Sequence, residues 1–221
     1  YDTLSKEELE KLNSENYVFK CRDGNIAIGK SDFLKLKSID WLIGNMINDL
    51  ECGNCEEIIE ICKEYEMDKA GVFGANEKDK LMNTSYRQTN IAWIPKGTVV
   101  ESLLHSHVGL ANMQAGWNFT VTDMEAAQFA EYTKGHFYDW HKDVALNPAT
   151  PHRKLSISVN LSDPKDYEGG DLELKNYWGT QDLKMPTAEL RKQGTVIVFP
   201  SMLMHRVTEV TKGTRYSLVQ W

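Results

Sequence analysis

The 221-residue sequence predicts an α+β fold in which supporting helices precede a double-stranded β-helix, or jelly-roll, core. From Trp117 onward, apolar and polar residues alternate with a period of two in about eight short segments separated by turn residues. The helical patterns lie mainly before these segments. We therefore expect one domain over residues 1–221, with an extension and first hairpin at 1–40, supporting helices and a strand at 54–114, and the jelly-roll core at 115–221.

The alternation is clearest where Leu155, Ile157 and Val159 interleave with two serines and an asparagine. Side chains of one parity share one face of a strand, so each such segment is expected to present two different faces. The expected core strands are 117–121, 126–132, 137–143, 155–161, 172–174, 195–199, 204–208 and 214–221.

The N-terminal part of the sequence is less regular. Residues 1–16 are polar and charged, and they predict a short amphipathic helix or a frayed end. Residues 17–28 alternate around Asp23-Gly24-Asn25, which predicts a hairpin. Residues 32–50 fit either a strand or a buried helix.

Two helices and a strand are expected between this region and the core. Asn54 and Glu57 have the spacing of a capping box, which predicts a helix beginning at Asn54. Residues 84–94 predict a strand. Trp93 in this strand and Trp117 further along the chain are both expected to be buried in the core. Residues 99–115 predict a second helix with an apolar stripe.

This second helix carries His105 and His107. Positions i and i+2 of a helix do not face each other, so the two histidines make a poor pair of metal ligands. We expect them to be solvated or packed instead.

Composition excludes several function classes. The net charge of −7 argues against a general nucleic-acid-binding surface. The sequence has no run of about 20 apolar residues and no secretory signal pattern. We therefore expect a cytoplasmic location, with neither a membrane span nor secretion. Cys52 and Cys55 form a C-x-x-C with no second pair, and we expect the cysteines to pack in the core or at helix ends. The oligomeric state stays open.

The residues His141, Asp143 and His205 carry the main chemical hypothesis. On a strand, positions i and i+2 point to the same side, so His141 and Asp143 could share one ion while Lys142 points away. Two imidazoles and one carboxylate bind one face of an octahedral metal and leave the other face open, which suits non-heme Fe(II) and dioxygen.

Arg215 stands ten residues after His205 and offers a second functional group. Arg215, Ser217 and Trp221 share one face of the last strand. If this face is turned into the barrel, the buried guanidinium needs a partner, and a dicarboxylic cosubstrate would supply one as a bidentate fork.

Three blocks around these residues resemble the prolyl-4-hydroxylase-like Fe(II)/2-oxoglutarate dioxygenases, and especially their PKHD-type hydroxylase branch. The blocks are 132–143, 153–172 and 194–221, with Gly169-Gly170-Asp171 in the second and Phe199-Pro200-Ser201 in the third. The resemblance covers residues 115–221 strongly and 54–114 weakly.

The resemblance implies Fe(II), 2-oxoglutarate and dioxygen as cofactors and leaves ascorbate open as a further one. It implies that His141, Asp143 and His205 bind the metal and that 2-oxoglutarate chelates it through the C1 carboxylate and the C2 keto oxygen. Arg215 and two neighbours would bind the C5 carboxylate. These neighbours are Tyr132 and Ser217. The implied reaction hydroxylates a substrate C–H bond and releases succinate and CO2, and a prolyl residue of a peptide or protein is the preferred substrate.

The loop 144–152 follows the metal-binding segment and contains two prolines, so it is expected to act as a lid. His152 and Arg153 at its end are candidates for substrate contact. Trp221 is another, as a wall of the cavity. Tyr138 is the weakest candidate, because its parity relative to His141 is odd and a regular strand would turn it outward; only a bulge would bring it inside.

Three alternatives stay open at this point. The enzyme could hydroxylate a free amino acid or another small molecule. The chain could be a jelly-roll binding module without catalysis, although His141, Asp143, His205 and Arg215 together argue against it. A zinc hydrolase would need a general base near the metal and leaves Arg215 without a role.

Overall fold

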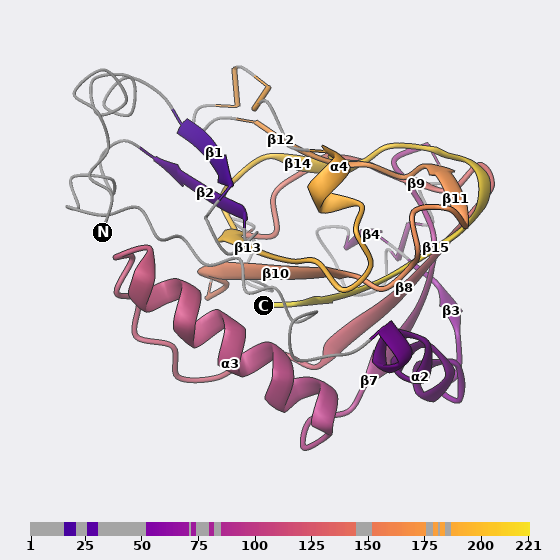
Figure 1. The fold of residues 1–221 in the computed structure, drawn as a ribbon, viewed down its shortest axis with the longest axis horizontal. Coiled ribbons are helices and arrows are strands. Elements are labelled where there is room, and N and C mark those ends of the chain that lie inside the picture. The colour runs from indigo at the N-terminus through magenta and orange to yellow at the C-terminus, as the bar shows by residue number, and fades with distance from the viewer. Residues whose placement is uncertain are drawn as a thin grey trace.

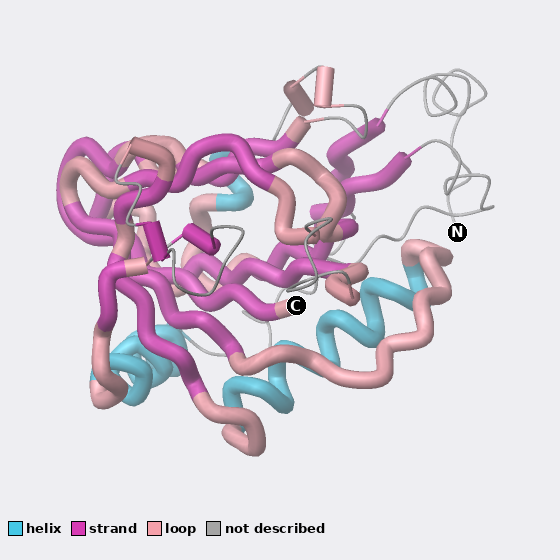
Figure 2. Tube along the Cα trace, turned by 180° about the vertical axis from the view of Figure 1, so that it is seen from behind, coloured by secondary structure: helices cyan, strands magenta, loops and turns pink. Residues whose placement is uncertain are grey.

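The computed structural model describes residues 16–20, 26–30, 52–70, 72–73, 80–81, 85–144, 152–175, 179–180, 182–183 and 187–221. Within these ranges two antiparallel sheets face each other, and the helices α2 and α3 lie on the outer side of the larger sheet (Figure 1, Figure 2). This is the predicted jelly-roll core with supporting helices, and the prediction of the fold class is confirmed.

The elements follow the chain in this order: β1 (Asn16–Lys20), β2 (Ile26–Lys30), α2 (Cys52–Lys63), β3 (Asp68–Lys69), β4 (Val72–Phe73), β5 (Lys80–Leu81), β6 (Arg87–Gln88), β7 (Asn90–Ile94), α3 (Val99–Gln114), β8 (Ala127–Thr133), β9 (Phe137–His141), β10 (Leu155–Asn160), β11 (Tyr167–Gly169), β12 (Leu172–Leu174), α4 (Thr187–Leu190), β13 (Val196–Pro200), β14 (His205–Val207) and β15 (Val210–Gln220).

The larger sheet has the strand order β13-β10-β15-β8-β7-β3, and β11 also pairs with β15. The smaller sheet has the order β12-β14-β9-β6. The long central strand β15 pairs with both β8 and β10, so it joins segments that lie far apart in the sequence. Its inward face and the smaller sheet together enclose the interior where the candidate site lies.

The strand β10 shows what the alternation of the sequence means here. All six of its residues are buried. The apolar side chains on one face of the strand, including Ile157 and Val159, belong to the main core cluster, which also contains residues of α2 and α3. The polar side chains on the other face, including Ser158 and Asn160, line the cavity near Arg215. Two buried faces with different polarity therefore separate the helix side of the sheet from the site side.

Several boundaries differ from the predictions. The helix α2 begins at Cys52, so Asn54 lies inside it and the capping-box prediction is wrong. The predicted strand 84–94 is two strands that belong to different sheets, β6 and β7. Trp93 is 43% exposed and is not a core residue, whereas Trp117 is buried as predicted. The helix α3 matches its prediction and begins after Thr98, whose side chain accepts a hydrogen bond from the Glu101 N–H.

The predicted first hairpin is present, because β1 and β2 pair antiparallel. The predictions for residues 1–15 and 32–50 lie outside the described residues, and the division into extension, supporting elements and core stays a prediction. Cys55 and Cys62 on α2 are buried in the main core cluster, as expected for core cysteines. Across the described helices, none combines the length and apolar character that a membrane span requires.

Candidate metal and cosubstrate site

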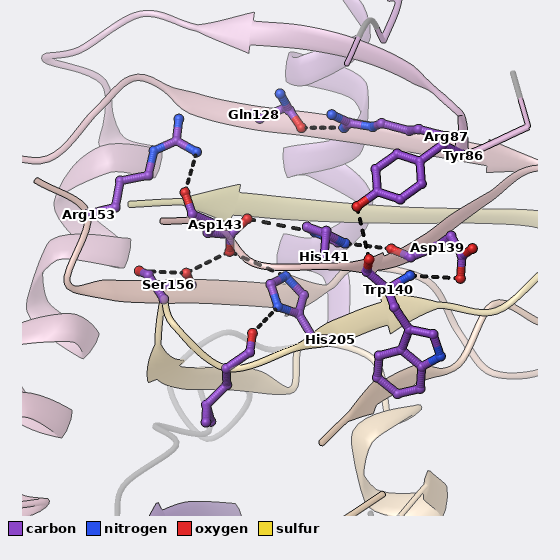
Figure 3. A network of polar contacts seen from close by, with 12 residues as sticks. Tyr86, Arg87, Gln128, Asp139, Trp140, His141, Asp143, Arg153, Ser156 and His205 are labelled. Carbon is purple, nitrogen blue, oxygen red and sulfur yellow. Dashed lines mark hydrogen bonds and ion pairs between the residues drawn. The ribbon is translucent and has the colours of Figure 1, made fainter. Parts of the chain in front are cut away.

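His141, Asp143 and His205 come together inside the fold (Figure 3). Each offers one ligand atom, and these atoms lie within 4.8 Å of one another. Asp143 Oδ1 is 3.7 Å from His141 Nε2, and Asp143 Oδ2 is 3.3 Å from His205 Nε2. All three side chains are buried, and the described residues contain no other group of three or more His, Cys, Asp or Glu with this geometry.

The two histidines are oriented by their other ring nitrogens. Nδ1 of His141 lies 2.7 Å from the Asp139 carbonyl oxygen, and Nδ1 of His205 lies 2.9 Å from the Leu203 carbonyl oxygen. A carbonyl oxygen only accepts, so in each histidine Nδ1 donates, and the neutral ring then leaves the Nε2 lone pair free. Histidines that ligate metals carry the same kind of outer hydrogen bond. These residues therefore fit a divalent metal ion.

Asp143 does not lie on the strand that was predicted to hold it. The strand β9 ends at His141, and Asp143 follows in a bend. Its N–H donates to the Ser201 carbonyl at 3.0 Å, and its Oδ2 accepts a hydrogen bond from Ser156 at 2.7 Å. The convergence with His141 is thus produced by contacts with β10 and with the turn after β13, and not by strand parity.

The charges of this cluster are strongly coupled. Burial raises the pKa of Asp143, but the charge and hydrogen bond of His205 and the charge of His141 outweigh it and hold the pKa below its usual value. Burial lowers the pKa of His141 to about 3, with a further lowering by His205. Burial also lowers the pKa of His205, but Asp143 more than compensates and the net pKa is raised. The arrangement keeps one carboxylate ionised beside a neutral His141.

Tyr138 lies against His141, contrary to the expectation for a regular strand. The two rings are stacked, with centroids 3.5 Å apart and planes 13° from parallel. The pairing of β9 with β14 shifts register between His141 opposite His205 and Tyr138 opposite Val207, which is the bulge that the odd parity requires. Burial raises the pKa of Tyr138, so its hydroxyl stays protonated.

Arg87 is a neighbour of this cluster that the sequence did not single out for the site. Its guanidinium lies 4.4 Å from the centre of the Tyr138 ring, and its Nη2 donates to Gln128 Oε1 at 2.7 Å (Figure 3). Arg87 and Tyr138 are opposite each other in the pairing of β6 with β9. Only the pairing of these two strands places Arg87 at the site, and a single sequence does not reveal which strands pair.

Arg215 is buried on the inward face of β15. Its Nη1 donates to Ser217 Oγ at 3.3 Å, and its Cζ lies 5.7 Å from the centre of the Tyr132 ring. Tyr132 is the residue directly opposite Arg215 on β8. Within the described ranges, no carboxylate lies within 4.0 Å of the Arg215 guanidinium. A buried cation of this kind fits an anionic group that enters from outside the chain.

A cavity borders Arg215 and extends toward α4. Its polar lining includes Ser158 and Asn160 of β10 and Thr195. The structure thus places Arg215, Ser217 and Tyr132 together, and this small cavity borders the guanidinium.

The residues predicted to contact the substrate at the mouth of the site, Arg153, His152 and Trp221, have different surroundings. Arg153 binds both oxygens of Glu125 at 2.6 Å and stacks 3.7 Å from the centre of the Trp221 ring. Trp221 in turn lies 6.4 Å from the exposed Trp93. His152 is exposed. The predicted lid at 144–152 lies, for residues 145–151, outside the described residues.

His105 and His107 show no metal geometry. They lie on α3, where His107 Nδ1 contacts the Leu103 carbonyl oxygen of its own helix at 2.7 Å, and His105 is exposed. The expectation of a solvated or packed role is met.

A jelly roll that holds two histidines and one carboxylate between its sheets, beside a buried arginine, belongs to the class of non-heme iron oxygenases. Residues 127–221 match the family model of the 2OG-Fe(II) oxygenase superfamily. This matched segment, which contains all three residues of the cluster and Arg215, supports an oxidoreductase of the kind that uses Fe(II), 2-oxoglutarate and dioxygen.

Individual relatives agree with this assignment. A PKHD-type hydroxylase of Prochlorococcus marinus is 29% identical over 192 residues, which cover 83% of this chain and 77% of the relative. The PKHD-type hydroxylase PiuC of Pseudomonas aeruginosa is 32% identical over 131 residues, which cover 53% of this chain and 55% of the relative. The chain is thus matched over about half the length of this second relative.

Among solved structures, a prolyl hydroxylase from Trichoplax adhaerens in complex with a peptide fragment has a similar fold. The TM-score is 0.60 at 18% sequence identity, over 82% of this chain and 87% of the other. This similarity concerns the fold.

Proposed function

We propose that this protein hydroxylates a C–H bond of a prolyl residue in a peptide or protein, with conversion of 2-oxoglutarate and dioxygen to succinate and CO2. The observation that carries the proposal is the pair of separate sites inside one barrel. One is the buried cluster of His141, Asp143 and His205, and the other is the buried guanidinium of Arg215 with no carboxylate beside it in the described part of the chain.

His141, Asp143 and His205 are the proposed metal ligands. Their Nδ1 hydrogen bonds leave both Nε2 atoms directed toward Asp143, so three ligand atoms face one point. Two nitrogens and one carboxylate oxygen are the donor set that suits Fe(II). A halogenase is disfavoured, because Asp143 occupies the position that a halide would need.

Arg215 is the proposed partner of the C5 carboxylate of 2-oxoglutarate. Its planar fork can donate two parallel hydrogen bonds to one carboxylate, and Ser217 already orients it. Tyr132, directly opposite on β8, is the proposed third contact. The apolar residues Ala130, Val207 and Val210 pack with Tyr132 in one buried cluster.

Trp221 and Tyr138 are the proposed contacts of the substrate. The flat apolar ring of Trp221 suits a pyrrolidine ring, and Tyr138 lies directly against the proposed metal ligand His141. Arg153 stacks on Trp221 with its charge already paired to Glu125, so it offers a flat surface more than a free charge. His152 stands next to Arg153 and is exposed, and we retain it as a candidate contact. The PKHD-type relatives are named hydroxylases, and the fold relative is described with a peptide fragment, which supports a peptide as the substrate.

Bound Fe(II), with 2-oxoglutarate and dioxygen, supplies the oxidising chemistry that side chains alone lack. The protein supplies position. His141, Asp143 and His205 hold one face of the site, Arg215 fixes the far end of the cosubstrate, and the stacked Tyr138 keeps the His141 ring from turning.

The deciding experiment combines purified protein, Fe(II), 2-oxoglutarate and a panel of proline-containing peptides, free amino acids and metabolites. Formation of succinate together with the mass gain of one oxygen atom on a peptide supports the proposal. Gain of one oxygen on a free amino acid instead would favour the small-molecule alternative. Absence of succinate formation with every compound, in protein that binds Fe(II), would favour a binding module. Activity with Zn(II) and without dioxygen would favour a hydrolase.

A further inference from the structure

Asp143 is held by two segments of the chain, through its carboxylate and through its backbone. Ser156 of β10 contacts its Oδ2 at 2.7 Å, and the Ser201 carbonyl accepts its N–H at 3.0 Å. The Arg153 Nη1 approaches its carbonyl oxygen at 3.5 Å (Figure 3). Both serines are fully buried, so these contacts are shielded from competing water.

The two serine hydroxyls form a chain that ends at the carboxylate. Their oxygens are 2.9 Å apart. Ser156 has one hydroxyl hydrogen, and the ionised carboxylate is a stronger acceptor than a neighbouring hydroxyl. Ser156 therefore donates to Asp143, and Ser201 donates to Ser156. Hydrogen bonds aligned in this way strengthen one another.

The same turn also orients His205. Ser201 follows β13 directly, and two residues later the Leu203 carbonyl accepts the hydrogen bond from His205 Nδ1 at 2.9 Å. The turn therefore links the main chain of Asp143, the side-chain relay to its carboxylate, and the ring of His205.

We propose that Ser156 is a positioning residue whose hydroxyl, supported by Ser201, fixes the rotation of the Asp143 carboxylate so that it binds the metal through a single oxygen. Without this hydrogen bond the carboxylate can rotate and offer both oxygens to one ion. The inference rests on the proposed function, because it assumes that Asp143 is a metal ligand.

The test measures binding of Co(II) as a probe by the full chain, using its visible absorption, which depends on the ligand geometry. Ser156→Ala should weaken Co(II) binding by about 10–100-fold, the usual effect of losing an outer hydrogen bond to a ligand, and should change the shape of the absorption spectrum. Ser156→Thr keeps a hydroxyl and should restore most of the affinity and the original spectrum.

Ser162→Ala is the matched control. Ser162 is also buried and accepts the Tyr216 N–H at 2.7 Å, so its loss removes a hydroxyl from the same segment six positions further along the chain. It should leave the affinity and the spectrum unchanged. Equal Co(II) affinity and an unchanged spectrum in Ser156→Ala would overturn the inference.

Two further outcomes are distinguishable. If the wild-type protein itself binds no Co(II) or Fe(II), the proposed function fails and not merely the role of Ser156. If Ser156→Ala does not fold, Ser201→Ala decides, because it keeps the bond from Ser156 to Asp143 and removes its support. A smaller loss of affinity with a shifted spectrum supports the relay, and wild-type behaviour overturns it.

Discussion

Arg215 and Tyr132 lie directly opposite each other on β15 and β8, and both side chains are buried on the face turned into the barrel. The guanidinium carbon is 5.7 Å from the centre of the tyrosine ring, and Ser217 is the hydrogen-bond partner that the structure gives Arg215. A buried guanidinium has five N–H donors that need acceptors. A ligand carboxylate would balance its charge and accept hydrogen bonds from these donors.

Replacing Arg215 by Ala should weaken binding of 2-oxoglutarate by roughly two to three orders of magnitude. The reason is that removing one partner of a buried, hydrogen-bonded charge pair typically costs about 3–5 kcal/mol, and about 1.4 kcal/mol corresponds to one factor of ten. The measurement is an anaerobic titration of 2-oxoglutarate into iron-loaded protein, followed by the metal-to-ligand charge-transfer band. Metal affinity should be nearly unchanged.

Arg215→Lys is the companion variant. Lysine carries a point charge without a planar fork, so it should rescue binding only in part. Wild-type affinity for 2-oxoglutarate in Arg215→Ala would show that the carboxylate binds elsewhere.

Replacing Asp143 by Ala should abolish turnover and strongly weaken Fe(II) binding, because it removes the anionic member of the three ligands. It also leaves two histidines without the charge that balances a divalent cation. Fe(II) binding is measured by anaerobic dialysis with metal analysis. Stoichiometric, tight Fe(II) binding by this variant would exclude the proposed ligand set.

The affinity for Fe(II) should decrease as the pH falls, and His205 should set this dependence. In the metal-free protein Asp143 raises the pKa of His205 above its usual value of 6.5, while burial keeps His141 neutral down to about pH 3. An imidazolium cannot bind a metal, so below the raised pKa the ion must displace the proton from His205 alone. Calorimetry in buffers of different ionisation enthalpy should detect proton release on Fe(II) binding at a pH below this raised pKa. Release of none would contradict the pairing of His205 with Asp143.

The thiol of Cys62 should be unreactive in the folded protein at about pH 8, because burial raises its pKa to about 12 and the thiolate is the nucleophile. The unfolded chain loses this proton nearer the ordinary value of 9.0, so folding stability should decrease as the pH rises from about 9 toward 12. Labelling with a thiol reagent, with and without denaturant and read by mass spectrometry of peptides, tests the site. Rapid labelling of native Cys62 would be inconsistent with this burial.

Gly213→Ala should destabilise the protein by about 1–3 kcal/mol, because φ is +74° and an added Cβ would collide with the backbone carbonyl of Asp166. Gly109→Ala is the control on α3, where nothing lies within 4 Å of the added Cβ, and it should stabilise by about 0.5–1 kcal/mol. Denaturant unfolding measures both. Equal stability of the two variants would mean that the turn at Gly213 relaxes at little cost.

The sequence by itself determined the features that depend on the period within one element. The parity of β15 placed Arg215 and Ser217 on one face, and the residue pattern of α3 predicted a helix that the structure has. The alternation along β10 separated Ile157 from Ser158, and these residues do lie on opposite sides of the sheet. Such features follow from the fixed geometry of a strand or a helix, which is the same wherever the element lies.

Only the tertiary structure decided the features that depend on how elements pair. The bulge between β9 and β14 turns Tyr138 onto His141, and the pairing of β6 with β9 adds Arg87 to the same cluster. Asp143 reaches the site from beyond the end of its strand, because Ser156 and Ser201 hold it there. Register shifts, bends and contacts between distant segments arise from the balance of packing and hydrogen bonding across the whole barrel. The spacing of residues along the chain does not reveal this balance.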